Sequence, residues 1–307
     1  MNLTPSVPMY ENDQPMTRAA RRRIHEWAVS LPSLFWLSLF FVIPTLLVFA
    51  IALRPPNPYG GIGRGWTLAN LRALASPVTV SIALRTLWIS LLAAAVCLLL
   101  AAPTGYFLAR VSARWKNALL MLIIVPFWTS FLVRVFAWKS LLHPEGPVKK
   151  LLVTAGLAGP ATPLLYNSGA VVLVTVYAYL PFTILPIYAA AEKFDFELLE
   201  AARDLGASRF QAFRRVFLPG IRTGLLTGLL FVLIPALGSY VIPDLVGGTG
   251  GEMIGNRIAQ RVFVDRNLPQ ASALSALLIL AVLVPLAAVL ALERRRERTE
   301  AAAGAET

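Results

Sequence analysis

The sequence predicts an all-α membrane protein that crosses the bilayer six times. Its residues are 57% hydrophobic and only 14% charged, whereas soluble domains contain about 25% charged residues. Six apolar runs are each long enough to span, because about 20 helical residues at 1.5 Å rise cross the hydrocarbon core. The runs are continuous and lack the alternation that is typical of transmembrane β-strands.

The six runs define one transmembrane domain over residues 33–292, flanked by tails at 1–32 and 293–307. Each run is expected to be a helix, because a backbone exposed to lipid must satisfy its own hydrogen bonds. The first run is longer than the apolar core of a signal peptide and no A-x-A cleavage site follows it, so it is expected to stay as a span. The predicted spans are 33–53, 80–102, 118–138, 169–191, 220–243 and 272–292.

The basic residues predict the orientation. The segments 1–32, 103–117, 192–219 and 293–307 lie on one side of a six-span protein and hold 16 of its 28 lysines and arginines. The positive-inside rule makes that side cytoplasmic, so both termini are expected there. The bias is clear but not extreme, since the other three connections hold nine basic residues. Because the net charge of +12 gathers at the ends of the spans, we expect contact with lipid headgroups and no nucleic-acid partner.

The three outer connections are each predicted to contain a short helix. The first begins at Thr67, the second covers the sequence VKKLLVTAGL at 148–157, and the third follows the glycines of 247–251. Cys97, the single cysteine, falls in the middle of a span and is expected to be a small packing residue. Arg134, near the outer end of the third span, is expected to extend toward the membrane surface.

The sequence contains no signature of an enzyme or of an ion-coupled pump. No Asp or Glu lies in the middle of a predicted span, although intramembrane ionisable groups mark proton pathways. The glycines of 60–65 and 247–251 lack the lysine of a phosphate-binding loop. We therefore expect no catalytic residue, metal or cofactor in this chain, and any energy for uphill transport must come from another subunit.

The cytoplasmic stretch 195–219 has the local signals of two short helices. Asp195 is a predicted N-cap, and Gly206 is suited to the left-handed position that follows a helix. Between them the apolar positions share one face, and they are Leu198, Ala201, Ala202 and Leu205.

The second helix is predicted to begin at once after Gly206. Ser208 and Gln211 have the spacing of a capping box, and Pro219 is expected to end the helix at the membrane. Its apolar side consists of Phe210, Phe213 and Phe217. Periodicity alone leaves two interpretations open, a solvated connector or a surface that docks a soluble partner.

The spacing of this stretch resembles a known motif. The pattern begins with Glu200-Ala-Ala, Gly206 follows after three residues, and Val216-Phe-Leu-Pro219 follows after nine more. It is similar to the EAA motif of permease subunits of bacterial ATP-binding-cassette (ABC) importers. The motif is written EAA-x3-G-x9-I-x-LP, and Val216 in place of isoleucine is the one departure. The resemblance to the spermidine/putrescine branch extends over about 33–292, including PFWTSFLVRVFAW at 126–138, the stretch 180–208 and the stretch 234–258.

The resemblance implies a fold, partners and site residues. The fold would be the type I ABC importer (MetI-like) permease fold in a bacterial inner membrane, and the chain would resemble the first of two paired permeases. Its partners would be a second permease, a dimer of cytoplasmic ATP-binding subunits that bind the ATP, and a solute-binding protein. The residues that couple it to the ATPase would be Glu200, Ala201, Ala202, Gly206, Leu218 and Pro219.

The branch implies a polyamine as the solute. Carboxylates and aromatic faces suit a polycation, and the candidates along the path are Asp244, Tyr240, Tyr177, Tyr179 and Trp128. Each has a plainer interpretation, because aromatic residues are common at membrane interfaces and Asp244 could cap the turn that follows it. Two alternatives stay open, an importer for another solute such as an opine or other amine, and an ion-coupled secondary transporter.

Overall fold

The computed structural model describes the backbone of residues 30–305 and the side chains up to Ala287 except Pro285, and all of its regular structure there is helical. Residues 1–29 of the predicted N-terminal tail lie outside the described residues. The chain divides into two compact units, one ending at Ala50 and the other beginning at Ile51. The first contains the π-helix η1 (Ser38–Val42) and most of α2 (Ile43–Ala52), within an apolar helical stretch, Ser30–Ala52, that is long enough to span.

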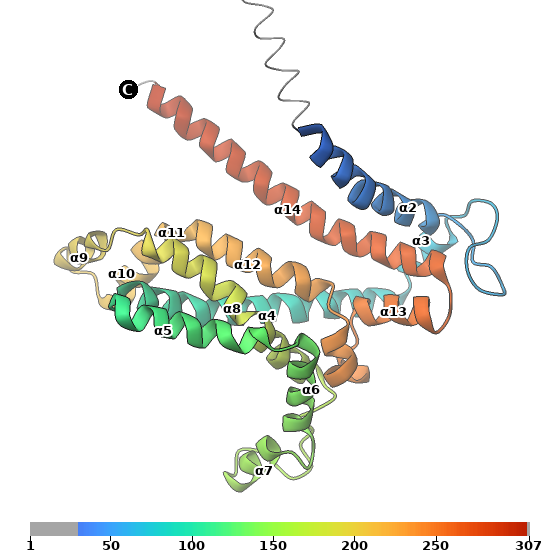
Figure 1. Cartoon of the computed structure of the whole chain (residues 1–307), viewed down its shortest axis with the longest axis horizontal. Helices are drawn as coiled ribbons and strands as arrows, with labels where there is room; N and C mark the ends of the chain where they lie inside the picture. Colours follow the sequence, from blue (N-terminus) through green and yellow to red (C-terminus); the bar gives the residue numbers. More distant parts are fainter. Residues whose placement is uncertain (1–29, 306–307) are drawn as a thin grey trace, which may run out of the picture. The chain divides into compact units, whose positions relative to one another are not determined.

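Three helices form the core of the second unit. They are α4 (Pro77–Arg110), α8 (Ser168–Glu192) and α12 (Arg222–Leu237), which lie side by side in Figure 1 and contact one another pairwise. The residues at their centre are small or β-branched, and they are Ala93, Ala94, Cys97, Val176 and Val232. Without a hydrophobic driving force in lipid, membrane helices rely on such small residues for close packing. Cys97 is fully buried there, as its predicted packing role requires.

Glycines bring α12 against α8 more closely than any side chain would allow. A Cβ at Gly224 would lie 2.5 Å from the Ala190 Cβ and 2.8 Å from the Pro186 carbonyl oxygen. A Cβ at Gly228 would lie 3.1 Å from a methyl of Thr183. These glycines therefore set the distance between the two helices.

Three of the predicted spans form long single helices in the described residues, and they are Ser30–Ala52, α4 and α8. The prediction of one continuous helix over 118–138 is wrong. The stretch consists of α5 (Ala113–Ile124), the 3-10 turn η2 (Val125–Trp128) and α6 (Phe131–Leu142), with a 90° bend after Trp128. Pro126 has no N–H to donate and the Thr129 hydroxyl donates to the Pro126 carbonyl, so the helical ladder is interrupted there.

The fifth and sixth spans also differ from the prediction. α12 ends at Leu237, six residues before the predicted end, because Gly238 follows it and the chain then enters the short π-helix η4 (Pro243–Gly247). α14 (Leu268–Ala305) begins four residues early and continues through most of the predicted C-terminal tail. By length and composition, up to five spans are present in the described residues if each bent pair counts as one.

The outer connections contain the expected short helices. They are α3 (Ala69–Leu74), which begins two residues after Thr67, α7 (Pro147–Thr154) and α13 (Ile254–Phe263). Lys149 of α7 is buried and donates to the carbonyls of Gly159 and Thr162, which fixes the loop after that helix. The guanidinium carbon of Arg134 lies 4.2 Å from the centre of the Phe127 ring, and its extension toward the membrane surface stays a prediction.

Candidate functional site

The predicted coupling stretch consists of four short elements. They are α9 (Glu197–Asp204), α10 (Arg209–Ala212), the π-helix η3 (Phe213–Phe217) and α11 (Leu218–Gly220). α9 begins one residue later than predicted, with Phe196 at the N-cap. The carboxylate of Asp195 still accepts the Glu197 N–H at 3.0 Å, so it satisfies one free donor of the first turn.

Gly206 ends α9 in the conformation that was predicted. Its φ is +91°, and the carbonyls of Arg203 and Ala202 accept the N–H groups of Gly206 and Ala207 at 2.9 and 3.0 Å. This pair of bonds is the Schellman arrangement, which needs a left-handed residue after the helix. A Cβ at Gly206 would meet nothing within 4 Å, so the backbone angle and not a shortage of space favours glycine.

The second helix also begins as predicted. The Ser208 hydroxyl accepts the Gln211 N–H at 3.2 Å and the Gln211 side chain accepts the Ser208 N–H at 2.9 Å, which is a complete capping box. Pro219 does not end the helix, because α11 continues to Gly220 and the chain turns at Ile221. The segments Arg209–Gly220 and Arg222–Leu237 then meet at 75°.

The apolar stripe of α9 faces outward. Leu198 is 52% exposed and Leu205 is 90% exposed, Ala201 is exposed as well, and Ala202 is half-buried. The residue that anchors α9 to the core is Leu199, which is 6% exposed and packs in the same cluster as Leu108 and Ile187. Sequence reasoning missed Leu199 because a helix with two apolar faces gives no sign of which one is buried.

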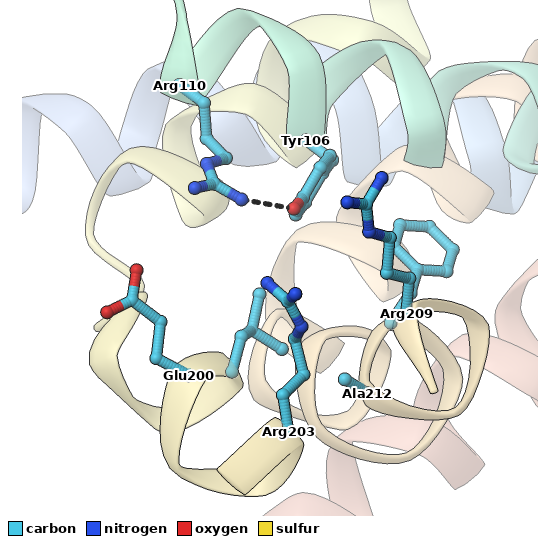
Figure 2. Close-up of a pocket in the computed structure, with 8 residues that line it drawn as sticks. Tyr106, Arg110, Glu200, Arg203, Arg209 and Ala212 are labelled. Atoms are coloured by element: carbon cyan, nitrogen blue, oxygen red, sulfur yellow. Dashed lines mark hydrogen bonds between the residues drawn. The ribbon is translucent and has the colours of Figure 1, made fainter. Parts of the chain in front are cut away.

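A charged cleft of about 450 Å³ lies between the end of α4 and the coupling helices. Figure 2 shows Arg110 and Tyr106 of α4 on one side, with Glu200 and Arg203 of α9 and Arg209 of α10 on the other. Arg110 donates to the Tyr106 hydroxyl at 2.6 Å. Within the described part of the chain none of these four charged side chains forms an ion pair. Arg203 and Arg209 belong to the predicted coupling stretch, but the sequence did not predict that Arg110 of α4 lines the same cleft.

Five aromatic rings pack together next to the cleft, and two of them, Tyr106 and Phe213, line it. Phe217 is fully buried, and its ring centroid lies 5.0 Å from that of Tyr106, 5.3 Å from that of Phe194 and 5.3 Å from that of Phe213. Phe196 completes the group at 6.3 Å. Three of these rings, Phe194, Phe196 and Tyr106, were not singled out in the sequence, where only the stripe Phe210, Phe213 and Phe217 was apparent. Phe210 stays outside and is 70% exposed.

Two of the five predicted substrate residues, Tyr240 and Asp244, lie one helical turn apart along the chain. Tyr240 is 45% exposed and its carbonyl accepts the Asp244 N–H at 3.0 Å. Asp244 is exposed on the first turn of η4 and lines an open cavity of about 640 Å³ together with Glu252 and Arg257, which were missed.

Asp244 alone of the five predicted residues is among those that line this cavity in the described part of the chain. Tyr177 packs edge-on against Trp138 with 5.3 Å between the ring centroids, and Tyr179 is half-buried on the same helix, α8. Trp128 is 79% exposed at the bend after η2. The polyamine contacts of all five residues remain predictions.

Three comparisons place the chain among known proteins. The spermidine/putrescine transport system permease proteins PotB of Haemophilus influenzae and Escherichia coli are 37% and 35% identical to it, each over 78% of this chain and over 84% and 87% of their own length. The inner membrane ABC transporter permease protein YdcU of Escherichia coli is 36% identical over 73% of this chain and 75% of its own.

Solved structures share the fold. Two crystal structures of a bacterial ABC transporter for alginate, one of them in complex with an alginate-bound periplasmic protein, match 92% of this chain with TM-scores of 0.62 and 0.69. The matched chains are covered to 99% and 98%, at 18% and 17% sequence identity. The all-α fold of this chain is therefore the permease fold.

The family model of binding-protein-dependent transport system inner membrane components matches residues 101–298, which include the whole coupling stretch. The chain belongs to this family of inner-membrane transport permeases.

Proposed function

We propose that this chain is the permease subunit through which an ATP-driven importer moves a polyamine, such as spermidine or putrescine, across the inner membrane. It would act with a second permease, a dimer of cytoplasmic ATP-binding subunits and a solute-binding protein on the outer side. We also propose the six-span topology over 33–292 with both termini in the cytoplasm, in which each bent pair counts as one span.

The observation that carries the proposal is the exposed face of the coupling stretch. Leu198, Leu205 and Phe210 are all more than half exposed, and exposed apolar groups that gather near charges are typical of protein interfaces. Burial of one such side chain contributes about 1.5–3 kcal/mol. Ala201 lies between the two leucines and lets a partner approach the α9 backbone closely.

The charges next to this face complete a docking surface. Glu200 and Arg203 of α9 line both the cleft of about 450 Å³ and a second cavity of about 570 Å³, which Ser208 and Arg209 also line. These charged side chains have no ion-pair partner among the described residues, so they are available to an ATP-binding subunit. There they would give orientation and specificity more than affinity. The ATP itself would bind to that subunit, because this sequence has no phosphate-binding loop.

The proposal of a polyamine as the solute is supported by the named relatives and by two residues of the third outer connection, Tyr240 and Asp244. Permeases named for spermidine and putrescine are 35–37% identical over most of their length, which supports a polyamine. Asp244, with Tyr240 next to it, would offer a carboxylate and an aromatic face to a polycation. Another solute is the alternative, since the YdcU name specifies none and the alginate transporter has the same fold.

The test is uptake into liposomes that contain the complete complex from the organism that encodes this chain. With the binding protein outside and ATP inside, we expect uptake of labelled spermidine or putrescine and no uptake of an alginate oligosaccharide. The control replaces ATP by a non-hydrolysable analogue, which should stop uptake. Equal uptake with that analogue and an imposed ion gradient would contradict the ATP-driven mechanism, and uptake of a sugar or an anion alone would contradict the solute.

A further inference from the structure

The five-ring cluster formed by Tyr106, Phe194, Phe196, Phe213 and Phe217 joins the coupling stretch to the membrane helices. Tyr106 belongs to α4, Phe194 and Phe196 to the connection between α8 and α9, and Phe213 and Phe217 to η3. Phe217 is the one ring that approaches all four others.

The backbone alone is poorly suited to transmit movement from α10 to α12. The two segments meet at 75°, so a displacement along the axis of α10 and α11 is not directed along the axis of α12. The ring of Phe217 instead contacts Tyr106 edge-on, at 5.0 Å and 83°. α4 in turn packs along both α8 and α12. A sideways displacement of η3 therefore reaches the three core helices through this contact.

Burial and tight packing make the cluster stiff. Phe217 is fully buried, and interiors of this density resist local compression. Gly220, one turn after Phe217, has no room for a Cβ because the Phe194 ring occupies that space. Edge-on and offset stacked pairs have preferred geometries, so the rings hold one relative orientation in place of several.

We propose that Phe217 is the positioning residue that transmits the movement of the coupling helices to α4, with Tyr106 as its main contact. The proposal rests on the proposed function, because it requires an ATP-binding subunit that moves α9 and α10. It assigns docking and transmission to different residues. Leu198, Leu205 and Phe210 face the partner, whereas Phe217 is turned toward the membrane helices and meets Tyr106 of α4 there.

The decisive variant is Phe217→Leu, which keeps an apolar side chain and loses the ring contacts. In liposomes that contain the complete complex, we expect the ATP-binding subunits to co-purify with the variant as with the parent and ATP hydrolysis to continue. The amount of solute imported per ATP hydrolysed should fall about tenfold, within the range typical of coupling between sites. Tyr106→Phe keeps the ring and loses only the hydroxyl to which Arg110 donates. The complex with this variant should therefore import as much solute per ATP hydrolysed as the parent.

Phe107→Leu is the matched control, because Phe107 lies next to Tyr106 on α4, is 57% exposed and is not a member of the cluster. The parental ratio is expected for it. A parental ratio in Phe217→Leu, or the same loss in Phe107→Leu, would overturn the proposal. Loss of co-purification in Phe217→Leu would also overturn it, because the residue would then serve docking or folding. Failure of the proposed function would look different, since the parent complex itself would import without hydrolysing ATP.

Discussion

At the scale of single residues, Gly206 is a position of the coupling stretch where the backbone angle makes substitution unfavourable. Its φ of +91° is unfavourable for any residue with a Cβ, and a change there alters the angle between α9 and α10. We expect Gly206→Asp to insert into the membrane at the parental level and to lose ATP hydrolysis stimulated by the solute-loaded binding protein. Membrane fractionation and ATPase assays of the complete complex measure the two properties.

Gly65→Asp provides the control for that substitution. Gly65 has a φ of +95° and, like Gly206, nothing within 4 Å of a Cβ, but it lies in the first outer connection. The two substitutions therefore carry a similar backbone penalty, but only Gly206→Asp lies in the coupling stretch. Gly206→Asn should retain part of the coupling, since asparagine tolerates left-handed angles better than other residues. Full stimulation in Gly206→Asp would show that the residue is not part of the coupling site.

At the scale of elements, the distance between α8 and α12 depends on the glycines at their contact. Gly224→Ala would place a methyl 2.5 Å from the Ala190 Cβ and 2.8 Å from a backbone carbonyl, and neither neighbour has a flexible end that can move aside. Overpacking of this kind costs about 1–3 kcal/mol, so the melting temperature of the detergent-solubilised protein should fall by several degrees. Gly250→Ala, at an open site with an ordinary backbone angle, should leave it unchanged. An unchanged melting temperature in Gly224→Ala would mean that the helices separate easily.

At the scale of the whole molecule, the sequence predicted the ends of short helices, but it did not predict where long helices bend or which residues pack between distant segments. The left-handed Gly206 and the Ser208–Gln211 capping box depend on a few neighbouring residues, and both appear as predicted. The bend after Trp128 was hidden, because an apolar run looks the same whether its helix continues or breaks. The burial of Leu199, and the approach of Arg110 and Tyr106 to the coupling helices, depend on packing between segments about 90 residues apart.

The last prediction concerns the whole molecule, namely the side of the membrane on which each connection lies. Ser112 lies between α4 and α5 and Ala161 lies between α7 and α8, and both are exposed. With six spans and both termini inside, Ser112 faces the cytoplasm and Ala161 the outer side. The native thiol of Cys97 is fully buried and should not react, so single substitutions can be made in the natural sequence. We expect a charged maleimide to label Ala161→Cys in intact spheroplasts, and Ser112→Cys only after permeabilisation, because the reagent cannot cross lipid. Labelling of both from outside would mean that α5 and α6 do not together cross the membrane, and the reverse pattern would place the coupling stretch on the wrong side for a cytoplasmic ATPase.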